Sequence, residues 1–120
     1  MRIDVVERDP NKLKRIPNVP KNKDIEITVE DSFSFFCIIG RDTTNCTVRV
    51  SYKPNEWLLE LISFRDYLKT IKKGILETVC YTIAEDLLNV LNCSEIVVEV
   101  TGVTQTHGKT TVKVRLVQNS

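Results

Sequence analysis

The spacing of apolar residues changes twice along this 120-residue chain, and this change limits the folds that the chain can adopt. Apolar and polar residues alternate in separate segments, as they do in half-buried strands. These segments are residues 25–30, 48–52, 96–100 and 112–116. Between the second and the third, apolar residues recur at helical spacing in two stretches, the first of which is expected to end at Gly74. The order strand, strand, helix, helix, strand, strand predicts an α+β domain.

The composition is typical of a globular protein with a single core. Apolar residues make up 42% of the chain and charged residues 28%, while the net charge is only +1. A charge this small gives no general argument for binding nucleic acid or membranes, so such an argument needs a local patch. The apolar runs are much shorter than a membrane span, and no signal-peptide core follows Met1. We therefore expect a cytoplasmic protein with no membrane partner.

Two parts are predicted along the chain. Residues 1–24 contain turn and extended motifs, and we interpret them as a basic extended N-terminal arm. The cations of this arm are Lys12, Lys14, Arg15, Lys21 and Lys23. Such runs are usually solvated, and contact with nucleic-acid phosphates is the functional alternative. Residues 25–120 are then expected to form one domain.

Four cysteines in a chain without a secretory signal are expected to be reduced thiols. No two of them form a C-x-x-C pair, and His107 is the only histidine. The sequence therefore argues against a zinc site, and we expect no metal. Cys46, Cys80 and Cys93 are interpreted as structural.

Cys37 differs from these three because it lies between an apolar run and a polar loop. Phe33–Phe36 can be buried in a core, whereas Gly40–Asn45 supplies turn residues and hydroxyl groups. The thiol is therefore expected where the core meets a solvent-facing pocket, with Arg41 as a nearby cation that favours the thiolate. Two interpretations stay open at this point: a nucleophile, or a buried structural cysteine, which is the commoner use of a free thiol.

Short motifs on either side of the thiol follow one another in a recognisable order. Residues 13–18 read Leu-Lys-Arg-Ile-Pro-Asn, residues 33–37 read Phe-Ser-Phe-Phe-Cys, and residues 52–55 read Tyr-Lys-Pro-Asn. Residues 59–63, Leu-Glu-Leu-Ile-Ser, lie in the first helical stretch, and Glu77 lies near the start of the second. In order and spacing, these motifs resemble those of the QueF family, including its shortened archaeal QueF-like branch.

The resemblance implies the tunnelling fold (T-fold). This fold has a four-stranded antiparallel sheet with two antiparallel helices on one face, in the order ββααββ. Such a sheet leaves two edges that a soluble monomer must protect. In the tunnelling fold the sheets join edge to edge into a ring, so we expect self-association, as a pentamer or a decamer, with active sites between subunits.

The resemblance also implies a reaction at the nitrile of 7-cyano-7-deazaguanine. Cys37 occupies the position of the nucleophile, which adds to the nitrile carbon and gives a covalent thioimide. In the reductase branch NADPH then delivers hydride twice. In the archaeal branch the base is already part of tRNA, and ammonia displaces the thiolate to give the formamidine of archaeosine. Glu60, Ser63 and Glu77 fall on substrate-binding motifs, and the two carboxylates are expected to accept hydrogen bonds from the base.

Departures from the family pattern decide which reaction we expect. Thr44 stands where the family has a proton-transferring aspartate, and Asp42 is a candidate substitute, so Cys37, Asp42 and Thr44 form the predicted catalytic set. Leu76 replaces a histidine, and residues 107–109 replace an Arg-Gly-Gly turn, which argues against an NADPH site. We therefore favour an archaeosine synthase-like amidinotransferase that uses ammonia and no cofactor, with tRNA as its partner. The alternatives are the NADPH-dependent reductase and a non-catalytic module that binds a base or RNA.

Overall fold

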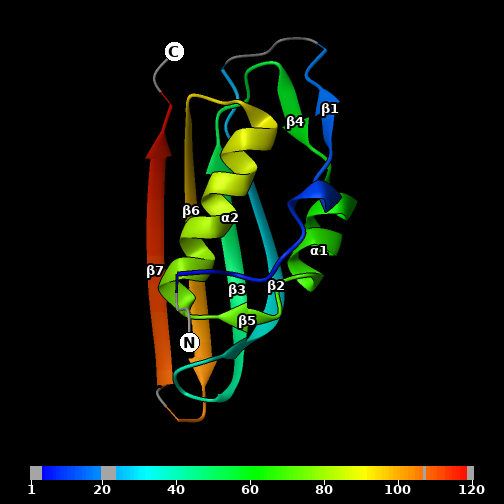
Figure 1. Cartoon of the computed structure of the whole chain (residues 1–120). Coiled ribbons are helices and arrows are strands. Elements are labelled where there is room, and N and C mark those ends of the chain that lie inside the picture. The colour runs from blue at the N-terminus through cyan, green and yellow to red at the C-terminus, as the bar shows by residue number, and fades with distance from the viewer. Residues whose placement is uncertain (1–3, 20–23, 107, 119–120) are drawn as a thin grey trace.

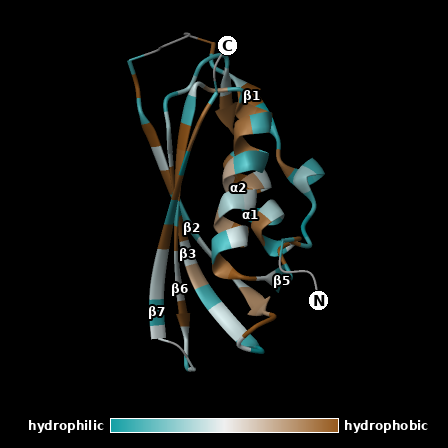
Figure 2. Ribbon diagram, turned by 60° about the vertical axis from the view of Figure 1, so that its left-hand side comes forward, coloured by the Kyte–Doolittle hydropathy of each residue, from teal (hydrophilic) through white to brown (hydrophobic). Residues whose placement is uncertain are grey.

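The computed structural model describes residues 4–19, 24–106 and 108–118. It contains two α-helices, α1 (Leu61–Lys69) and α2 (Leu76–Leu91), and a short 3-10 turn at Pro10–Lys12. The strands are β1 (Arg15–Pro17), β2 (Ile27–Cys37), β3 (Asp42–Tyr52), β4 (Trp57–Leu59), β5 (Lys73–Gly74), β6 (Glu95–Thr104) and β7 (Gly108–Val117). Both helices lie on the same side of a twisted main sheet (Figure 1 and Figure 2).

The main sheet has five strands in the order β5-β2-β3-β6-β7. The four long strands are antiparallel to their neighbours, whereas β5 runs parallel to the last two residues of β2. A separate two-stranded sheet pairs β1 with β4. The long strands and helices thus follow the predicted order, but the prediction of a four-stranded sheet is incomplete.

The strands that the prediction omits are too short to show a pattern. Each of β1, β4 and β5 has two or three residues, and alternation cannot be recognised over so few. The expectation that the first helix continues to Gly74 is wrong, because α1 ends at Lys69 with Thr70 as its C-cap. The chain then crosses to the end of β2, where Phe36 N–H donates to the Lys72 carbonyl at 2.8 Å.

A tight hairpin joins β2 to β3 and sets the register of both strands. Its loop ends at Arg41, which has a left-handed conformation (φ 61°) and donates its N–H to the Cys37 carbonyl at 2.8 Å. Cys37 pairs with Asp42 across the hairpin, and Phe35 pairs with Thr44. Partners in an antiparallel ladder project to the same face of the sheet. Cys37, Asp42 and Thr44 therefore share the face that the helices cover.

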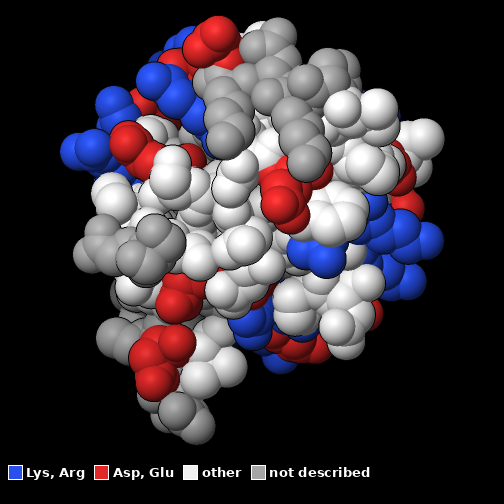
Figure 3. Space-filling model, turned by 90° about the horizontal axis from the view of Figure 1, so that it is seen from above, with Lys and Arg blue, Asp and Glu red and all other residues white. Residues whose placement is uncertain are grey.

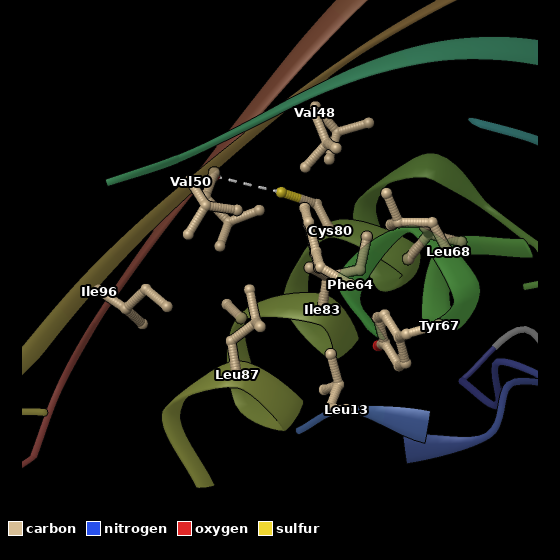
Figure 4. Packing of buried hydrophobic residues seen from close by; sticks show 14 of the residues in the cluster. Leu13, Val48, Val50, Phe64, Tyr67, Leu68, Cys80, Ile83, Leu87 and Ile96 are labelled. Carbon is tan, nitrogen blue, oxygen red and sulfur yellow. Dashed lines mark hydrogen bonds between the residues drawn. The ribbon is translucent and has the colours of Figure 1, made fainter. Parts of the chain in front are cut away.

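The core lies between this face and the two helices. α2 packs on β6 and β7, and α1 packs on β2. Val48, Val50 and Ile96 of the sheet and Ile83 and Leu87 of α2 are completely buried in one cluster, and Figure 4 shows these sheet residues facing the helical ones. Each such side chain stabilises the fold by about 1.5–3 kcal/mol relative to exposure. The core thus fixes α2, and with it the place where α2 begins.

The described part of the N-terminal segment packs on the helices. Val6 and Leu13 are buried, and β1, which comes shortly after Leu13 in the chain, pairs with β4. Figure 4 shows Leu13 beside the helical side chains of the core. Lys21 and Lys23 of the predicted basic arm lie outside the described residues, and the division of the chain at residue 24 stays a prediction.

A buried carboxylate joins the N-terminal segment to both helices. Nε and Nη2 of Arg8 each donate to Asp86 of α2 at 3.0 Å, so the pair is bidentate. The Tyr67 hydroxyl of α1 donates to the same carboxylate at 2.6 Å. Burial, and secondly the hydrogen bond to Asp86, raise the pKa of Tyr67, so the phenol keeps the proton that it donates.

Replacing Tyr67 with phenylalanine tests this buried network. Tyr67→Phe removes the 2.6 Å hydrogen bond and leaves Asp86, which is only 5% exposed, with one donor fewer. Loss of a buried hydrogen bond to a charged group should lower the free energy of unfolding by about 1.5–3 kcal/mol, which urea titration measures. Tyr81→Phe is the matched control, because Tyr81 lies on α2 and is 47% exposed. Equal urea midpoints for the two variants would contradict the prediction.

Candidate active site

A pocket of about 260 Å³ lies beside Cys37. Its walls come from the end of β2, from β3, from the first residues of α2 and from the adjacent ends of β6 and β7. Among the predicted site residues it brings together Cys37, Thr44 and Glu77. Apolar side chains such as Ile39 and Leu76 complete the lining, as is usual for sites that bind small molecules.

Cys37 is the last residue of β2, and its thiol is half-buried and free. The N–H of Gly40 in the hairpin loop donates to the Sγ atom at 3.4 Å. A donor aimed at sulfur stabilises negative charge there, which is the form in which a cysteine acts as a nucleophile. The thiol lies next to a loop, as predicted, but the loop is shorter than the predicted residues 40–45: the turn covers residues 38–41, and residues 42–45 belong to β3.

The other three cysteines are in a different environment. Cys46, Cys80 and Cys93 are buried, and Cys80 donates its S–H to the Val98 carbonyl at 3.4 Å. Burial raises the pKa of Cys46 to about 12 and that of Cys80 to about 11, and it also raises the pKa of Cys93. These thiols therefore stay protonated near neutral pH and act as small core residues.

The two candidate proton-transfer residues are placed differently. Thr44 is 4% exposed and lines the pocket. Asp42, directly across the hairpin from Cys37, is half-buried and accepts a 2.7 Å hydrogen bond from the Thr106 hydroxyl. Asp42 is not part of the pocket lining.

The first turn of α2 brings Glu77 to the pocket. The helix begins at Leu76 after Ile75, an extended residue that provides no side-chain cap. The first N–H groups of a helix have no intrahelical partner and carry the positive end of its dipole. An exposed carboxylate in that turn, Glu77, is therefore stabilised, and it faces the same pocket as the thiol.

Glu60 and Ser63 lie elsewhere and have structural partners. The Glu60 carboxylate caps α1, accepting from the N–H groups of Ile62 at 2.6 Å and Ser63 at 3.2 Å. The Ser63 hydroxyl accepts from the Lys14 N–H at 3.0 Å and donates to the Glu60 carbonyl at 2.7 Å. Neither residue lines the Cys37 pocket, and their predicted role in binding a base stays a prediction.

Gly102 is a pocket residue that the sequence analysis does not single out. A Cβ atom at this position of β6 would lie 2.8 Å from Thr44 Cγ2 and 3.2 Å from Leu76 Cδ1. Both neighbours would have to move, because real Cβ contacts are longer. A glycine inside a strand is itself a sequence signal of such close approach.

The described ranges contain no cluster of metal ligands and no membrane-crossing helix. There, no three His, Cys, Asp or Glu side chains gather as metal ligands would. None of the helices described has the length and apolar character that crossing a bilayer needs.

The fold and the pocket define an α+β protein with a half-buried thiol beside a small pocket. No protein-family model matches the chain. In sequence, the chain is 32% identical over 83 residues to the NADPH-dependent 7-cyano-7-deazaguanine reductase of Thermomicrobium roseum. That match covers 66% of this chain and 64% of the relative, which is slightly less than two thirds of its length.

The fold is shared with a protein of known structure. The chain matches the apo crystal structure of the archaeosine synthase QueF-Like with a TM-score of 0.64 and 16% identity, over 76% of this chain and 90% of that one. At this identity the match shows a common fold. With the sequence match, it confirms the predicted resemblance to the QueF family.

Alkylation should separate Cys37 from the other thiols. With iodoacetamide near pH 8, folded protein should gain one carbamidomethyl group, at Cys37, because the other three thiols are buried and their raised pKa values keep them protonated. Peptide mass spectrometry locates the label, Cys37→Ser should remove it, and urea should expose all four cysteines. Labelling of Cys46 or Cys80 at the same rate in the folded state would contradict this assignment.

Proposed function

We propose that the protein is an archaeosine synthase-like amidinotransferase that acts on the nitrile of 7-cyano-7-deazaguanine in tRNA. The observation that supports this most directly is the pocket in which Cys37, Thr44 and Glu77 meet. It combines a nucleophile, a hydroxyl group and a carboxylate in a space of small-molecule size. A cytoplasmic location is part of the proposal.

The reaction follows from the chemistry of a thiolate and a nitrile. The Cys37 sulfur adds to the nitrile carbon, and the nitrogen takes up a proton, which gives a thioimide. Ammonia then adds to the same carbon, the C–S bond breaks, and the thiol is regenerated as the former nitrile becomes an amidine. Covalent catalysis of this kind divides one difficult addition into two easier ones.

Glu77 is proposed to recognise the base. Its carboxylate lines the pocket and is held at the start of α2, where the helix dipole favours its negative charge. A carboxylate accepts two parallel hydrogen bonds, and the N–H edge of a deazaguanine offers such a pair of donors. The charge of Glu77 thus favours a guanine-like base over one that presents acceptors.

The choice of ammonia over hydride rests on what surrounds the thiol. Leu76 presents an apolar side chain to the pocket and cannot donate a proton. Residues 107–109 replace the family's Arg-Gly-Gly turn. His107 lies outside the described residues, so Lys109 is the one certain cation that this turn offers to a nucleotide phosphate. The reductase is the alternative, favoured by the name of the sequence relative. A non-catalytic base-binding or RNA-binding module is the other.

The proposed tRNA contact depends on local cations. Lys12, Lys14 and Arg15 are exposed near β1 and can contact phosphates. On the end of the molecule seen in Figure 3, Lys and Arg are interspersed with Asp and Glu, so no single-sign field covers it. The net charge of +1 is too small to attract tRNA, so binding would depend on contacts between individual cations and phosphates.

Self-association into a T-fold ring, as a pentamer or decamer, is part of the proposal. Within the described chain, β5 covers only Phe36 and Cys37 of β2, so Ile27–Phe35 presents an open edge, and β7 is the opposite edge. Long open edges favour pairing with another strand. Since Glu60 and Ser63 do not reach the pocket of their own chain, a role for them in base binding requires a second copy.

Sedimentation velocity at micromolar concentration should therefore show a species of several subunits, with a mass near five or ten times that of the 13.8 kDa chain. A stable monomer across that range would exclude the ring and would leave Glu60 and Ser63 with capping roles only.

The nitrile reaction can be tested directly. Incubation with free 7-cyano-7-deazaguanine, followed by intact-mass measurement, should reveal a covalent adduct in the wild type and in Cys46→Ser but none in Cys37→Ser. Glu77→Gln should need about 10- to 150-fold more base for the same labelling, because it loses a charged hydrogen bond worth roughly 1.5–3 kcal/mol.

Adding the second substrate to the covalent adduct identifies the reaction. Ammonia should release the adduct as an amidine, with tRNA bearing the nitrile base as the better substrate. Release that depends on NADPH would assign the reductase instead, and binding of the base without any adduct would favour the non-catalytic module.

A further inference from the structure

Thr44 is a buried residue whose side chain carries a hydroxyl group. The residue is 4% exposed, and in the part of the chain that the structure describes its Oγ1 atom forms no hydrogen bond. Nor is this atom sealed inside the protein, because Thr44 lines the pocket beside Cys37. From the pocket, the hydroxyl can therefore exchange a hydrogen bond with a water molecule or with a polar atom of a bound ligand.

Gly102 determines which way the Thr44 side chain points. The Thr44 methyl group, Cγ2, occupies the space next to Gly102 where a Cβ atom would otherwise lie, only 2.8 Å away. A β-branched side chain has few rotamers, so packing its methyl group on one side fixes its hydroxyl on the other. The glycine thus orients the hydroxyl without any hydrogen bond to it.

Thr44 and Cys37 are diagonal neighbours on adjacent strands. Cys37 pairs with Asp42, and Thr44 is two residues further along β3 on the same face. The Cα atoms of diagonal neighbours in an antiparallel pair are about 7–8 Å apart. Both side chains project to the same side of the sheet and line the same pocket, so a small linear group bound there, such as a nitrile, can lie within reach of both. The uncapped first turn of α2, at Ile75 and Leu76, lines the same space and favours negative charge there.

We propose that Thr44 relays the proton during thioimide formation. Its hydroxyl gives its hydrogen to the nitrile nitrogen and receives the hydrogen that leaves the Cys37 thiol, directly or through one water molecule. The S–H bond and one π bond of the nitrile break, and the C–S and N–H bonds form, so no other acid or base is consumed. This inference rests on the proposed reaction of Cys37 with the nitrile.

The placement of Asp42 is consistent with this role for Thr44. The Asp42 carboxylate accepts a hydrogen bond from the Thr106 hydroxyl at 2.7 Å and does not line the pocket. A hydroxyl group, unlike an ionised carboxylate, both donates and accepts a hydrogen bond, as a relay requires. The pocket therefore combines a relay that carries no charge with a helix end that stabilises one.

Substitution of Thr44 tests the relay. Thr44→Val keeps the shape of the side chain and removes the hydroxyl, while Thr44→Ser keeps the hydroxyl. The rate of adduct formation with 7-cyano-7-deazaguanine, followed by intact mass, should fall by about 10²- to 10⁴-fold in Thr44→Val and recover to within about tenfold of wild type in Thr44→Ser. Alkylation of Cys37 by iodoacetamide needs no protonation of a nitrogen, so its rate should be the same in all three proteins.

The outcomes separate this inference from the proposed function. An adduct that forms equally fast in wild type and Thr44→Val overturns the relay and leaves the nitrile reaction intact. No adduct in the wild type overturns both. If adduct formation and alkylation fall together in Thr44→Val, the side chain only shapes the pocket and the relay is wrong. Thr44→Ala gives the same comparison if the valine variant does not fold.

Discussion

The pairing of β5 with the end of β2 fixes the geometry on which the pocket depends, although it involves two residues on each strand. It holds the chain that leaves α1 against the strand of the thiol, so that α2 begins beside it. Gly74 permits α2 to pack closely on β5, because a Cβ atom there would lie 2.9 Å from Val79 Cγ2 in the first turns of α2. Glu77 reaches the pocket because a glycine three residues earlier lets the helix begin there.

The Asp86 carboxylate also fixes the position of one segment against another, because it binds Arg8 of the N-terminal segment and Tyr67 of α1. It is almost completely enclosed, and its charge is balanced by Arg8, whose side chain is 32% exposed. A buried ion pair adds little net stability when it is intact, but loss of one partner is costly because the other charge stays buried. The N-terminal segment is therefore held in place by the cost of leaving Asp86 without its cation. Both helices depend on it, since Tyr67 of α1 and Asp86 of α2 share the contact.

The sequence predicted the parts of this structure that repeat and missed those that depend on single contacts. Alternation and helical spacing identified the four long strands and both helices, because burial of one face imposes a period on many residues. Of the site residues that the motif resemblance suggested, the fold brings Cys37, Thr44 and Glu77 to one pocket from β2, β3 and α2. Asp42, Glu60 and Ser63 do not line it, and the roles of all six stay predictions. A glycine in a strand can signal close approach, but the role of Gly102 depends on packing against Thr44 and Leu76, which are distant from it in the sequence, so the sequence did not specify it. β5 was missed because its two residues are too few to show an alternating pattern.

The short strand β5 also has a consequence for any second chain that adds to the sheet. Because Phe36 and Cys37 already pair with β5, an incoming strand can align only with Ile27–Phe35 and must halt before the thiol. β5 thus occupies the edge of β2 at Phe36 and Cys37 and limits how far an added strand can extend along it. The pairing of β5 with β2 therefore sets the end of the edge that is open to another chain, close to Cys37.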